Sequence, residues 1–323
     1  MAEIMDILAP LIKNINQTMI DLIGRDEAAV ARVSGYSFDG GGKRLRPLMF
    51  CLVSEALGRP LNRPCLEIAA SFEFLHMATL LHDDIVDVAE VRRGRAAAHL
   101  VFGTPEAVLA GDYLLSKAAA LGAATGNLKC VQVMSRVAGT LSLGELVQLG
   151  SRRQVELSES AYFQIIYRKT AVLMEGAARI AALLAGADGR EEAAARRYGL
   201  QFGLAFQIMD DILDYQGDEA TFGKPVGHDL DEGKITLPFI KAREALDDRK
   251  RARLCELAER DSLSPQDHEE IQALVLAGGG VNSAHLKADE LAHEAMEALS
   301  QFQPSPARDK LEALAALAAA RSY

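Results

Sequence analysis

Apolar residues recur at spacings of three and four along almost the whole chain, and this pattern predicts a protein built from α-helices. Ala and Leu dominate, runs of β-branched residues are short, and no dense Gly/Pro turn pattern recurs, all of which favours helix over strand. We expect helices near residues 3–22, 44–57, 65–88, 105–122, 127–150, 159–185, 190–215, 235–247, 263–277, 281–300 and 306–320.

The clearest predicted boundary is a helix start at Ser264, followed by Pro265 and Asp267. This order supplies a capping residue, a first-turn proline and a capping-box acid. Three glycines from Gly278 predict the end of the same helix. No low-complexity linker, solenoid repeat or change in composition divides the chain, so we expect a single domain over residues 1–323.

The composition fits a globular protein, because 49% of the 323 residues are apolar and 25% are charged. The net charge of −10 argues against a nucleic-acid partner, which would require a basic face. An acidic protein also repels anionic ligands through its overall field. If the ligands are anionic, positive charge must be concentrated locally or supplied by metal ions.

Cysteine usage and hydropathy give expectations about location. The four cysteines form no CxxC pair, so we expect reduced thiols and a cytoplasmic protein rather than a zinc or redox site. The first 29 residues are typical of an amphipathic helix and lack the features of a signal peptide. No run of 18 apolar residues is free of charge (Arg179 interrupts GAARIAALLAGA), so we expect no transmembrane helix.

Two aspartate clusters with the same spacing lie at the ends of apolar runs. They are Asp83, Asp84 and Asp87 in LLHDDIVD, and Asp210, Asp211 and Asp214 in QIMDDILD. On a helix, the first and last aspartate of each cluster share a face. The middle aspartate lies about 100° round the helix and can serve as a flanking ligand.

Carboxylates among apolar residues are costly unless cations neutralise them, and their mutual repulsion raises their pKa values. Oxygen ligands without Cys or His favour Mg²⁺, Mn²⁺ or Ca²⁺. A solvated acidic helix face is the alternative for one such motif, but two copies at the ends of apolar runs favour metal binding. The loop pattern of an EF-hand is absent. We therefore predict that all six aspartates are catalytic metal ligands.

Basic residues lie beside both clusters. A predicted helix start follows three glycines and Lys43, where free N–H groups and the helix dipole favour a phosphate. The candidate phosphate-binding cations are Lys43, Arg46, Arg92, Arg93, Lys169, Lys224 and Lys234. Each alone is typical of a surface charge. Together with six aspartates and three Mg²⁺, however, they nearly balance two diphosphates of roughly −3 each.

These motifs resemble those of the trans-isoprenyl diphosphate synthases, and most of all the bacterial octaprenyl and related long-chain synthases of quinone biosynthesis. The resemblance covers nearly the whole chain and rests on GGGKRLRP, LLHDDIVD followed by RRG, AGDYLL, YRKTA, FQIMDDILDY and GKPVGHDLDEGKITLP. It implies an all-α bundle of antiparallel helices around a central cavity, usually as a homodimer.

The resemblance also implies roles. The six aspartates would hold Mg²⁺, three ions per active site with Mn²⁺ as a substitute, against an allylic diphosphate. The residues contacting the same diphosphate would be Arg92, Lys169, Gln207, Lys224 and Lys234. Those binding isopentenyl diphosphate would be Lys43, Arg46, His76 and Arg93. His76 alone is typical of a core histidine, and its place seven residues before Asp83 makes it a candidate.

The implied reaction begins with ionisation of the allylic substrate as its diphosphate leaves. The double bond of isopentenyl diphosphate attacks the cation, which groups near Lys169 and Thr170 would steady, and a proton is then lost. The product is longer and still allylic, so the cycle can repeat. No protein nucleophile is required.

Small residues one turn before the first cluster bear on product length. Ala78 lies roughly 7 Å below the metals at a helical rise of about 1.5 Å per residue, and Thr79 follows it. Short-chain members of the family tend to have aromatic residues there. Because both residues here are small, we expect an open tunnel and a product of about C35–C50, with octaprenyl favoured by the resemblance. Candidates for a deeper floor, each also typical of core packing, are Phe72, Leu75, Met134, Val137, Thr140 and Leu141.

Other functions remain open from the sequence. A short-chain farnesyl or geranylgeranyl synthase shares every diphosphate motif. A terpene cyclase would usually lack the second aspartate cluster and have more aromatic residues than the 6% found here. A non-catalytic partner subunit or lipid carrier with the same fold would be expected to have lost site residues, and none of them is missing.

Overall fold

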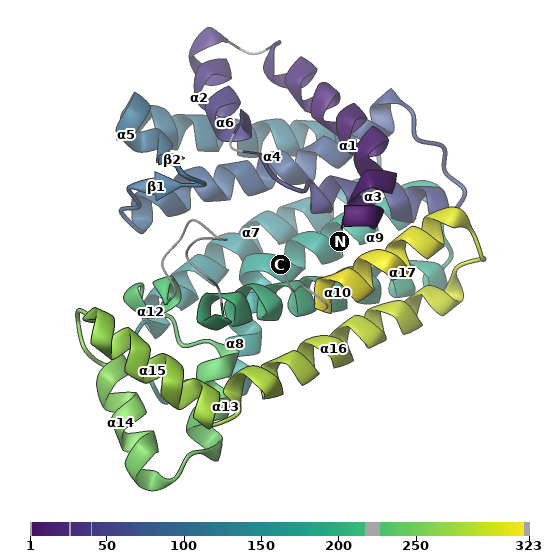
Figure 1. Ribbon diagram of the computed structural model, residues 1–323. Coiled ribbons are helices and arrows are strands. Elements are labelled where there is room, and N and C mark those ends of the chain that lie inside the picture. The colour runs from purple at the N-terminus through teal and green to yellow at the C-terminus, as the bar shows by residue number, and fades with distance from the viewer. Residues whose placement is uncertain (1, 26, 40, 217–226, 320–323) are drawn as a thin grey trace. The chain divides into compact units, whose positions relative to one another are not determined.

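The computed structural model describes residues 2–25, 27–39, 41–216 and 227–319 (Figure 1). Nearly all regular structure in these residues is helical, which confirms the all-α expectation. Within the same residues, β1 (Val91–Arg92) and β2 (Arg95–Ala96) form the one small sheet. None of the four cysteines is paired.

The chain divides into two compact units, each assembled from three segments. Unit 1 contains Met1–Gly139, Leu173–Gly199 and Ala298–Ala313, and unit 2 contains Thr140–Val172, Leu200–Glu297 and Leu314–Tyr323. Three helices are divided between the units: α7 (Leu128–Ser151), α10 (Gly189–Gln216) and α17 (Pro306–Ala319). Two more, α9 (Val172–Ala185) and α16 (Gly280–Ala298), have a single terminal residue in the other unit. The single domain over residues 1–323 stays a prediction.

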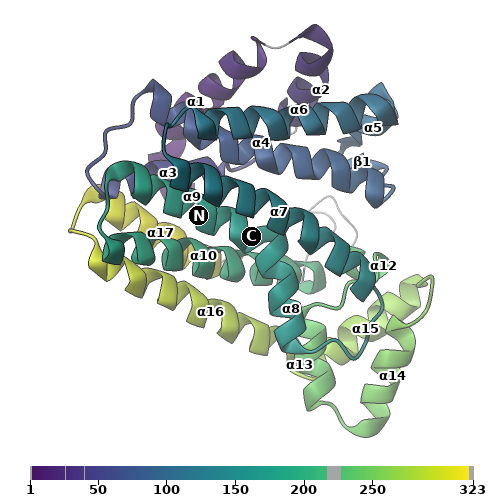
Figure 2. The ribbon, with the colours of Figure 1, turned by 180° about the vertical axis from the view of Figure 1, so that it is seen from behind.

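Unit 1 is organised around the apolar helix α4 (Arg63–Val86), which packs along α6 (Thr104–Ala123); the two lie side by side in Figures 1 and 2. Gly111 permits this approach, because a Cβ there would collide with the ring of His82. The other elements of the unit are α1 (Ala2–Ile23), α2 (Ala28–Asp39), α3 (Leu45–Ala56), α5 (Ala98–Phe102), α9 (Val172–Ala185) and the 3₁₀ turn η2 (Leu299–Gln301).

Among the described residues, one helix is long and apolar enough to cross a membrane when judged by length and composition alone. This helix is α4, and 67% of its most apolar window is buried inside the structure. The core helices of water-exposed proteins pass the same test, and the burial of α4 matches that of a core helix.

The C-terminus of α4 presents the first aspartate cluster and ends in a Schellman motif. The Ala89 N–H donates to the Asp84 carbonyl at 2.9 Å, and the Val88 N–H donates to the Ile85 carbonyl at 3.3 Å. Val88 occupies the left-handed position with φ of 52°, where glycine or asparagine is usual. A β-branched residue is strained in this conformation, and the side chain of Val88 gains little from packing because it is 77% exposed.

Unit 2 contains the first part of the expected helix over 159–185, which is interrupted. It consists of α8 (Glu159–Ile166), the π-helical turn η1 (Tyr167–Ala171) and α9. The turn contains Lys169 and Thr170. Single π-helical turns are frequent at functional sites, because the extra residue changes the direction in which side chains point. The remaining helices of the unit are α12 (His228–Asp231), α13 (Leu237–Ala245), α14 (Asp248–Ala258), α15 (Pro265–Ala277) and α16 (Gly280–Ala298).

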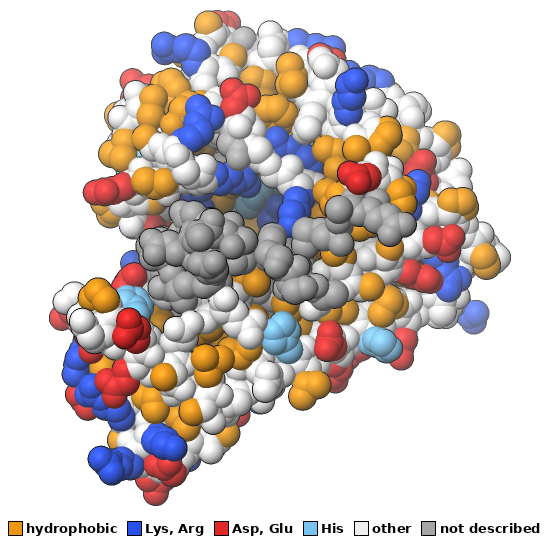
Figure 3. All heavy atoms as spheres, viewed as in Figure 1, with side chains coloured by type: hydrophobic (Ala, Val, Ile, Leu, Met, Phe, Trp, Pro, Cys, Tyr) orange, Lys and Arg blue, Asp and Glu red, His pale blue; other side chains and the backbone are white. Residues whose placement is uncertain are grey.

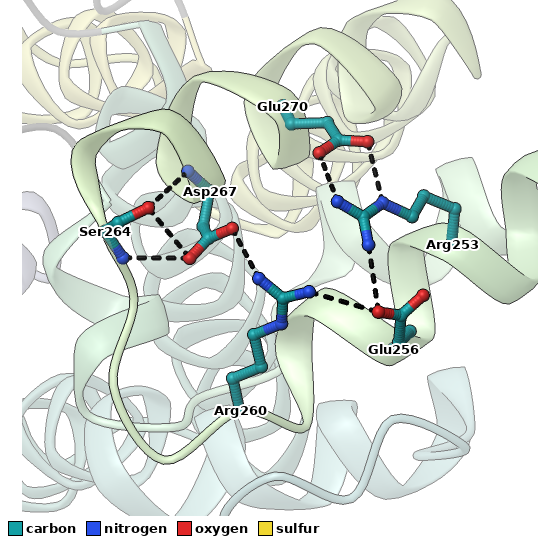
Figure 4. A network of polar contacts seen from close by, with 6 residues as sticks. All are labelled: Arg253, Glu256, Arg260, Ser264, Asp267 and Glu270. Carbon is teal, nitrogen blue, oxygen red and sulfur yellow. Dashed lines mark hydrogen bonds and ion pairs between the residues drawn. The ribbon is translucent and has the colours of Figure 1, made fainter.

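A surface network of ion pairs joins α14 to α15. Acidic and basic side chains mix over these helices at the lower left of Figure 3. Arg253 forms a two-bonded pair with Glu270 at 2.6 and 2.8 Å, and Arg260 contacts Asp267 at 2.7 Å (Figure 4). Ser264 and Asp267 complete the capping box, which confirms the predicted start of this helix.

Most expected helices are confirmed to within a few residues, but α2, α5, α12 and α14 were not expected. The sequence of α14, DRKRARLCELA, is highly charged, so its apolar periodicity is weak. Its capping residue Asp247, whose side chain accepts from the Lys250 N–H at 3.0 Å, is the signal that could have identified it.

We expect Val88→Asn to raise the free energy of unfolding by about 1 kcal/mol, because asparagine tolerates the left-handed conformation better than valine does. Urea denaturation of both proteins measures the change. Val91→Asn is the matched control, since Val91 is also exposed but lies in β1 without a positive φ. A Val88→Asn protein no more stable than the control would show that the position is not strained.

Candidate active site

In unit 1 the first cluster borders an open pocket, and Asp84 is one of its lining residues. Its charged and titratable lining groups are Arg44, Glu73, His76, Asp84, Arg92, Arg93 and Arg95. Four guanidinium groups against two carboxylates leave the pocket locally basic within an acidic protein. This is the local concentration of positive charge that an anionic ligand would require.

Arg92 reaches the first cluster from a tight hairpin. Its guanidinium donates to Oδ1 of Asp84 through Nε at 2.7 Å and also through Nη2. The turn between β1 and β2 is Arg93-Gly94, with φ values of 53° and 74° at its two central positions. This is the pattern of a type I′ turn, which explains the glycine of the RRG motif. Arg93 in turn donates to the Gly41 carbonyl in the glycine loop.

Arg44 organises the loop that begins α3, and its side chain is almost fully buried. It donates to Asn16 at 2.9 Å, to Glu73 at 3.0 Å and to the Phe38 carbonyl at 3.1 Å. These bonds tie the loop to α1, α2 and α4. Arg44 is therefore a structural residue, while its neighbours Lys43 and Arg46 remain half-buried beside it.

His76 stands in the same pocket, half-buried on α4. Desolvation holds the pKa of His76 well below its usual range, and the guanidinium groups of Arg46, Arg93, Arg92 and Arg44 lower it further. His76 is therefore neutral at physiological pH, and one ring nitrogen is available as an acceptor while the other donates.

In unit 2 the second cluster is held by a continuous chain of hydrogen bonds, of which the one from Tyr162 to Asp211 is buried. Asp211 is 4% exposed, and it accepts from the Tyr162 hydroxyl at 2.6 Å and from the Gln207 amide at 2.8 Å. The Oε1 of Gln207 accepts from the Thr170 hydroxyl at 2.6 Å. The structure thus links three predicted site residues, Thr170, Gln207 and Asp211, and adds Tyr162.

The burial of this chain shifts two pKa values. Desolvation raises the pKa of Asp211 well above its usual range, and Asp229 raises it further, while the bonds from Tyr162 and Gln207 act in the opposite direction. Desolvation also raises the pKa of Tyr162, so its phenol remains a donor. The two donors therefore favour the carboxylate form of Asp211 against its burial.

Asp214 and Lys234 meet through Asp229. The Asp229 N–H donates to the Asp214 carboxylate at 3.1 Å, and the Asp229 carboxylate contacts Lys234 at 3.3 Å. Lys234 also pairs with Glu232. Although burial disfavours its charged form, Asp229 and Glu232 raise the pKa of Lys234 above its usual value, so it stays protonated.

Lys169 lies on the π-helical turn and pairs with Glu145 of α7 at 2.7 Å. Two glycines allow the turn to fit closely. A Cβ at Gly144 would lie 2.7 Å from that of Arg168, and a Cβ at Gly203 would lie 2.6 Å from the Cα of Ala171. Substitution at either glycine would displace the segment that carries Lys169.

The donor set of the six aspartates fits Mg²⁺, because it contains oxygen ligands and no Cys or His. Within the described parts of the chain, no three or more His, Cys, Asp or Glu side chains form a group able to hold a metal ion. Mg²⁺ usually takes only one or two carboxylates and completes its shell with water and substrate phosphates. The residues present therefore fit ions that bind together with a phosphate ligand.

Within each cluster the middle aspartate differs from the outer two. Asp84 and Asp211 are buried, whereas Asp83, Asp87 and Asp214 are half-buried and Asp210 is exposed. Lys224 was predicted to contact the diphosphate, but it lies outside the described residues.

Four residues of the site were not predicted from the sequence: Tyr162, Asp229, Glu145 and Glu73. Asp229 could have been predicted, because it lies in the family motif GKPVGHDLDEGKITLP. Tyr162 and Glu73 gave no local signal, since an isolated aromatic or acid inside an apolar helix is typical of core packing.

Most candidate residues for product length lie in unit 1, while Thr140 and Leu141 of α7 belong to unit 2. Ala78 is fully buried, and the Thr79 hydroxyl donates to the His76 carbonyl at 2.9 Å. Farther along α4, Phe72 lies close to Gly176 and Val137, because a Cβ at Gly176 would be 2.6 Å from Val137 and 3.7 Å from Phe72. Met134 lies close to Gly122, because a Cβ added at Gly122 would be 2.7 Å from the sulfur of Met134.

Comparison with known proteins places the chain in a family. A sequence model of the polyprenyl synthetase family matches residues 27–275. The octaprenyl diphosphate synthase of Escherichia coli K12 is 35% identical over 319 residues, which are 99% of this chain and 98% of that protein. A short chain isoprenyl diphosphate synthase of Methanothermobacter thermautotrophicus is 34% identical over 324 residues, or 98% of each chain.

The crystal structure of a polyprenyl synthase from Caulobacter crescentus CB15, complexed with calcium and isoprenyl diphosphate, has the same fold. Its TM-score is 0.91 at 36% identity, over 98% of this chain and 97% of that one. The relatives thus agree in family and differ in the chain length that their names give. The chain belongs to the polyprenyl synthetase family of transferases.

Proposed function

We propose that this transferase is a long-chain all-trans polyprenyl diphosphate synthase. It would add isopentenyl diphosphate units to an allylic diphosphate such as farnesyl diphosphate, and its product would serve as a quinone side chain. The observation that supports this most directly is the pair of matched clusters, each with a buried middle aspartate held by protein donors and outer aspartates left more accessible.

The basic pocket of unit 1 is the proposed site for isopentenyl diphosphate. The residues proposed to hold its diphosphate are Lys43, Arg46 and Arg93, because guanidinium groups offer forked donors that match phosphate oxygens, and neutral His76 can donate one further bond. The second diphosphate, that of the allylic substrate, would be contacted by Arg92, Lys169, Gln207 and Lys234. Lys169 would exchange its bond to Glu145 for one to the substrate.

The outer aspartates of each cluster, Asp83 and Asp87 with Asp210 and Asp214, are the proposed direct ligands of Mg²⁺. We expect three Mg²⁺ ions per site, with Mn²⁺ as a substitute. When bound, these ions would neutralise the negative charge of the departing diphosphate. The middle aspartates would orient the groups around them, because their oxygens already accept bonds from Arg92, Tyr162 and Gln207. The Thr170 hydroxyl and nearby carbonyls would steady the allylic cation.

We expect purified protein to convert farnesyl diphosphate and labelled isopentenyl diphosphate to extractable product with Mg²⁺, and EDTA to abolish this activity. Asp83→Asn should lower kcat/KM at least about a hundredfold, which is the loss typical when a charge-stabilising group is removed from an active site. The matched control is Asp248→Asn, because Asp248 is a fully exposed aspartate of α14. This substitution should leave kcat/KM unchanged. Lipid binding without turnover would instead favour a carrier.

The product is proposed to be octaprenyl diphosphate, within a range of about C35–C50, because the residue that lies buried roughly 7 Å along α4 from the first cluster is the small Ala78 and not an aromatic. The approach of Phe72 to Val137, and of Met134 to Gly122, supports a floor deeper in unit 1. A short-chain product remains the alternative, and the short-chain relative shows that overall similarity does not decide between them.

Ala78→Phe is expected to shorten the products toward about C15–C20, because an aromatic ring one turn from the aspartates would fill the path of the tail. Reversed-phase chromatography of the dephosphorylated products measures their length. Thr79→Val, which keeps the side-chain volume, should leave the length unchanged. An Ala78→Phe protein that is folded and active with unchanged products would refute this position for the path.

A homodimer is proposed through α6 and the start of α7, where Leu109 and Leu128 are 66% and 70% exposed and Tyr113 is also exposed. Apolar groups of this size on a surface favour a partner. Sedimentation equilibrium should give twice the chain mass of 34.8 kDa, and Leu109→Lys should shift the protein toward monomer. A wild-type protein that sediments at 34.8 kDa would rule the dimer out.

The cytoplasm is the proposed location, in keeping with four unpaired cysteines.

A further inference from the structure

Tyr162 has no assigned role, yet it is placed where the second aspartate cluster is most constrained. It lies on α8, 2% exposed, and its hydroxyl donates to Oδ2 of Asp211 at 2.6 Å. The other oxygen of Asp211 accepts from Gln207, so both oxygens of this buried carboxylate are occupied by protein donors. Short bonds from neutral donors to a carboxylate are among the stronger hydrogen bonds in proteins.

We propose that Tyr162 is a positioning residue of the active site, which fixes the Asp211 carboxylate and, through it, the amide of Gln207 and the hydroxyl of Thr170. This inference rests on the proposed function, because it explains how that site is kept in order. The direction of each bond supports it. Tyr162 and the Gln207 amide both donate to Asp211, which leaves the Gln207 carbonyl oxygen to accept from Thr170.

Each hydrogen bond in this chain has a fixed donor and a fixed acceptor. If Tyr162 did not occupy Oδ2, Asp211 could rotate and accept Gln207 through either oxygen, and the Gln207 amide would be free to turn over. The Thr170 hydroxyl would then lose its fixed acceptor. Tyr162 of α8 and Asp211 of α10 are distant in sequence but joined by a direct hydrogen bond. In addition, α8 leads directly into the π-helical turn that contains Thr170.

The hydrogen bond also affects the outer aspartates indirectly, because Asp210 and Asp214 share the last turns of α10 with Asp211. Anchoring the middle aspartate limits the rotation of these turns and so fixes where the outer carboxylates point. Groups that orient metal ligands typically change metal affinity by about ten- to a hundredfold when they are removed. An effect of that size is expected here although Tyr162 itself touches neither metal nor substrate.

The test uses full-length protein and Tyr162→Phe, which removes only the hydroxyl. Isothermal titration calorimetry with inorganic pyrophosphate at several Mg²⁺ concentrations is the primary readout, so that binding is measured apart from catalysis. We expect the Mg²⁺ concentration for half-maximal pyrophosphate binding to rise about tenfold. In steady-state assays kcat should fall about tenfold, while KM for isopentenyl diphosphate, whose proposed site lies in unit 1, should stay unchanged.

Tyr198→Phe is the matched control. Tyr198 is also a fully buried tyrosine whose hydroxyl donates at 2.7 Å, but its acceptor is the Leu311 carbonyl in unit 1, away from both clusters. Both variants should lose similar thermal stability, and only Tyr162→Phe should change the Mg²⁺ requirement. Equal Mg²⁺ requirements in the two variants would overturn the proposal, because Tyr162 would then act on stability alone.

Tyr162→Phe leaves the buried Asp211 carboxylate with one hydrogen-bond donor fewer, which could prevent folding. A double variant keeps the inference testable in that case. Tyr162→Phe combined with Asp211→Asn removes that charge, and the double variant should bind Mg²⁺ and pyrophosphate as Asp211→Asn does alone. A further loss in the double variant would mean that Tyr162 acts by another route. If the wild-type protein bound no pyrophosphate with Mg²⁺, the proposed function itself would fail, which separates the two claims.

Discussion

The structure depends on supplying hydrogen-bond donors to aspartates that are buried at the ends of apolar helices. Asp84 and Asp211 are each 4% exposed, and a carboxylate so deeply buried is stable only with strong donors aimed at it. Unit 1 supplies an arginine, Arg92, and unit 2 supplies a phenol and an amide, Tyr162 and Gln207. The two clusters share one sequence pattern, but the buried aspartate of one is hydrogen-bonded by a charged donor and that of the other by two neutral donors.

Several irregular features follow from this requirement. The type I′ turn at Arg93-Gly94 brings Arg92 back to the helix end that it has just left. The π-helical turn directs Thr170 toward Gln207, and Gly144 and Gly203 allow its backbone to approach α7 and α10 closely. The strained Val88 ends α4 directly after Asp87. Regular helix supplies the framework, and the departures from it place the donors.

Much of this could be predicted from the sequence, for identifiable reasons. The long helices have strong apolar periodicity, so their positions were expected to within a few residues. The clusters and Arg92 lie in or beside contiguous motifs that local spacing reveals, whereas Gln207 was predicted through the family resemblance. Tyr162, Glu73 and Glu145 could not be found in this way, because their partners Asp211, Arg44 and Lys169 are distant in sequence. The π-helical turn also escaped prediction, since its periodicity differs from that of an α-helix by only one residue.

We propose that both clusters bind divalent ions that hold the same leaving diphosphate. The most direct measurement is anomalous diffraction from crystals soaked with Mn²⁺ and an unreactive allylic thiolodiphosphate. The account predicts Mn²⁺ peaks on Asp83 and Asp87 and on Asp210 or Asp214, all bridged by the same diphosphate. Mn²⁺ at one cluster alone, or ions at the two clusters that share no diphosphate, would contradict it.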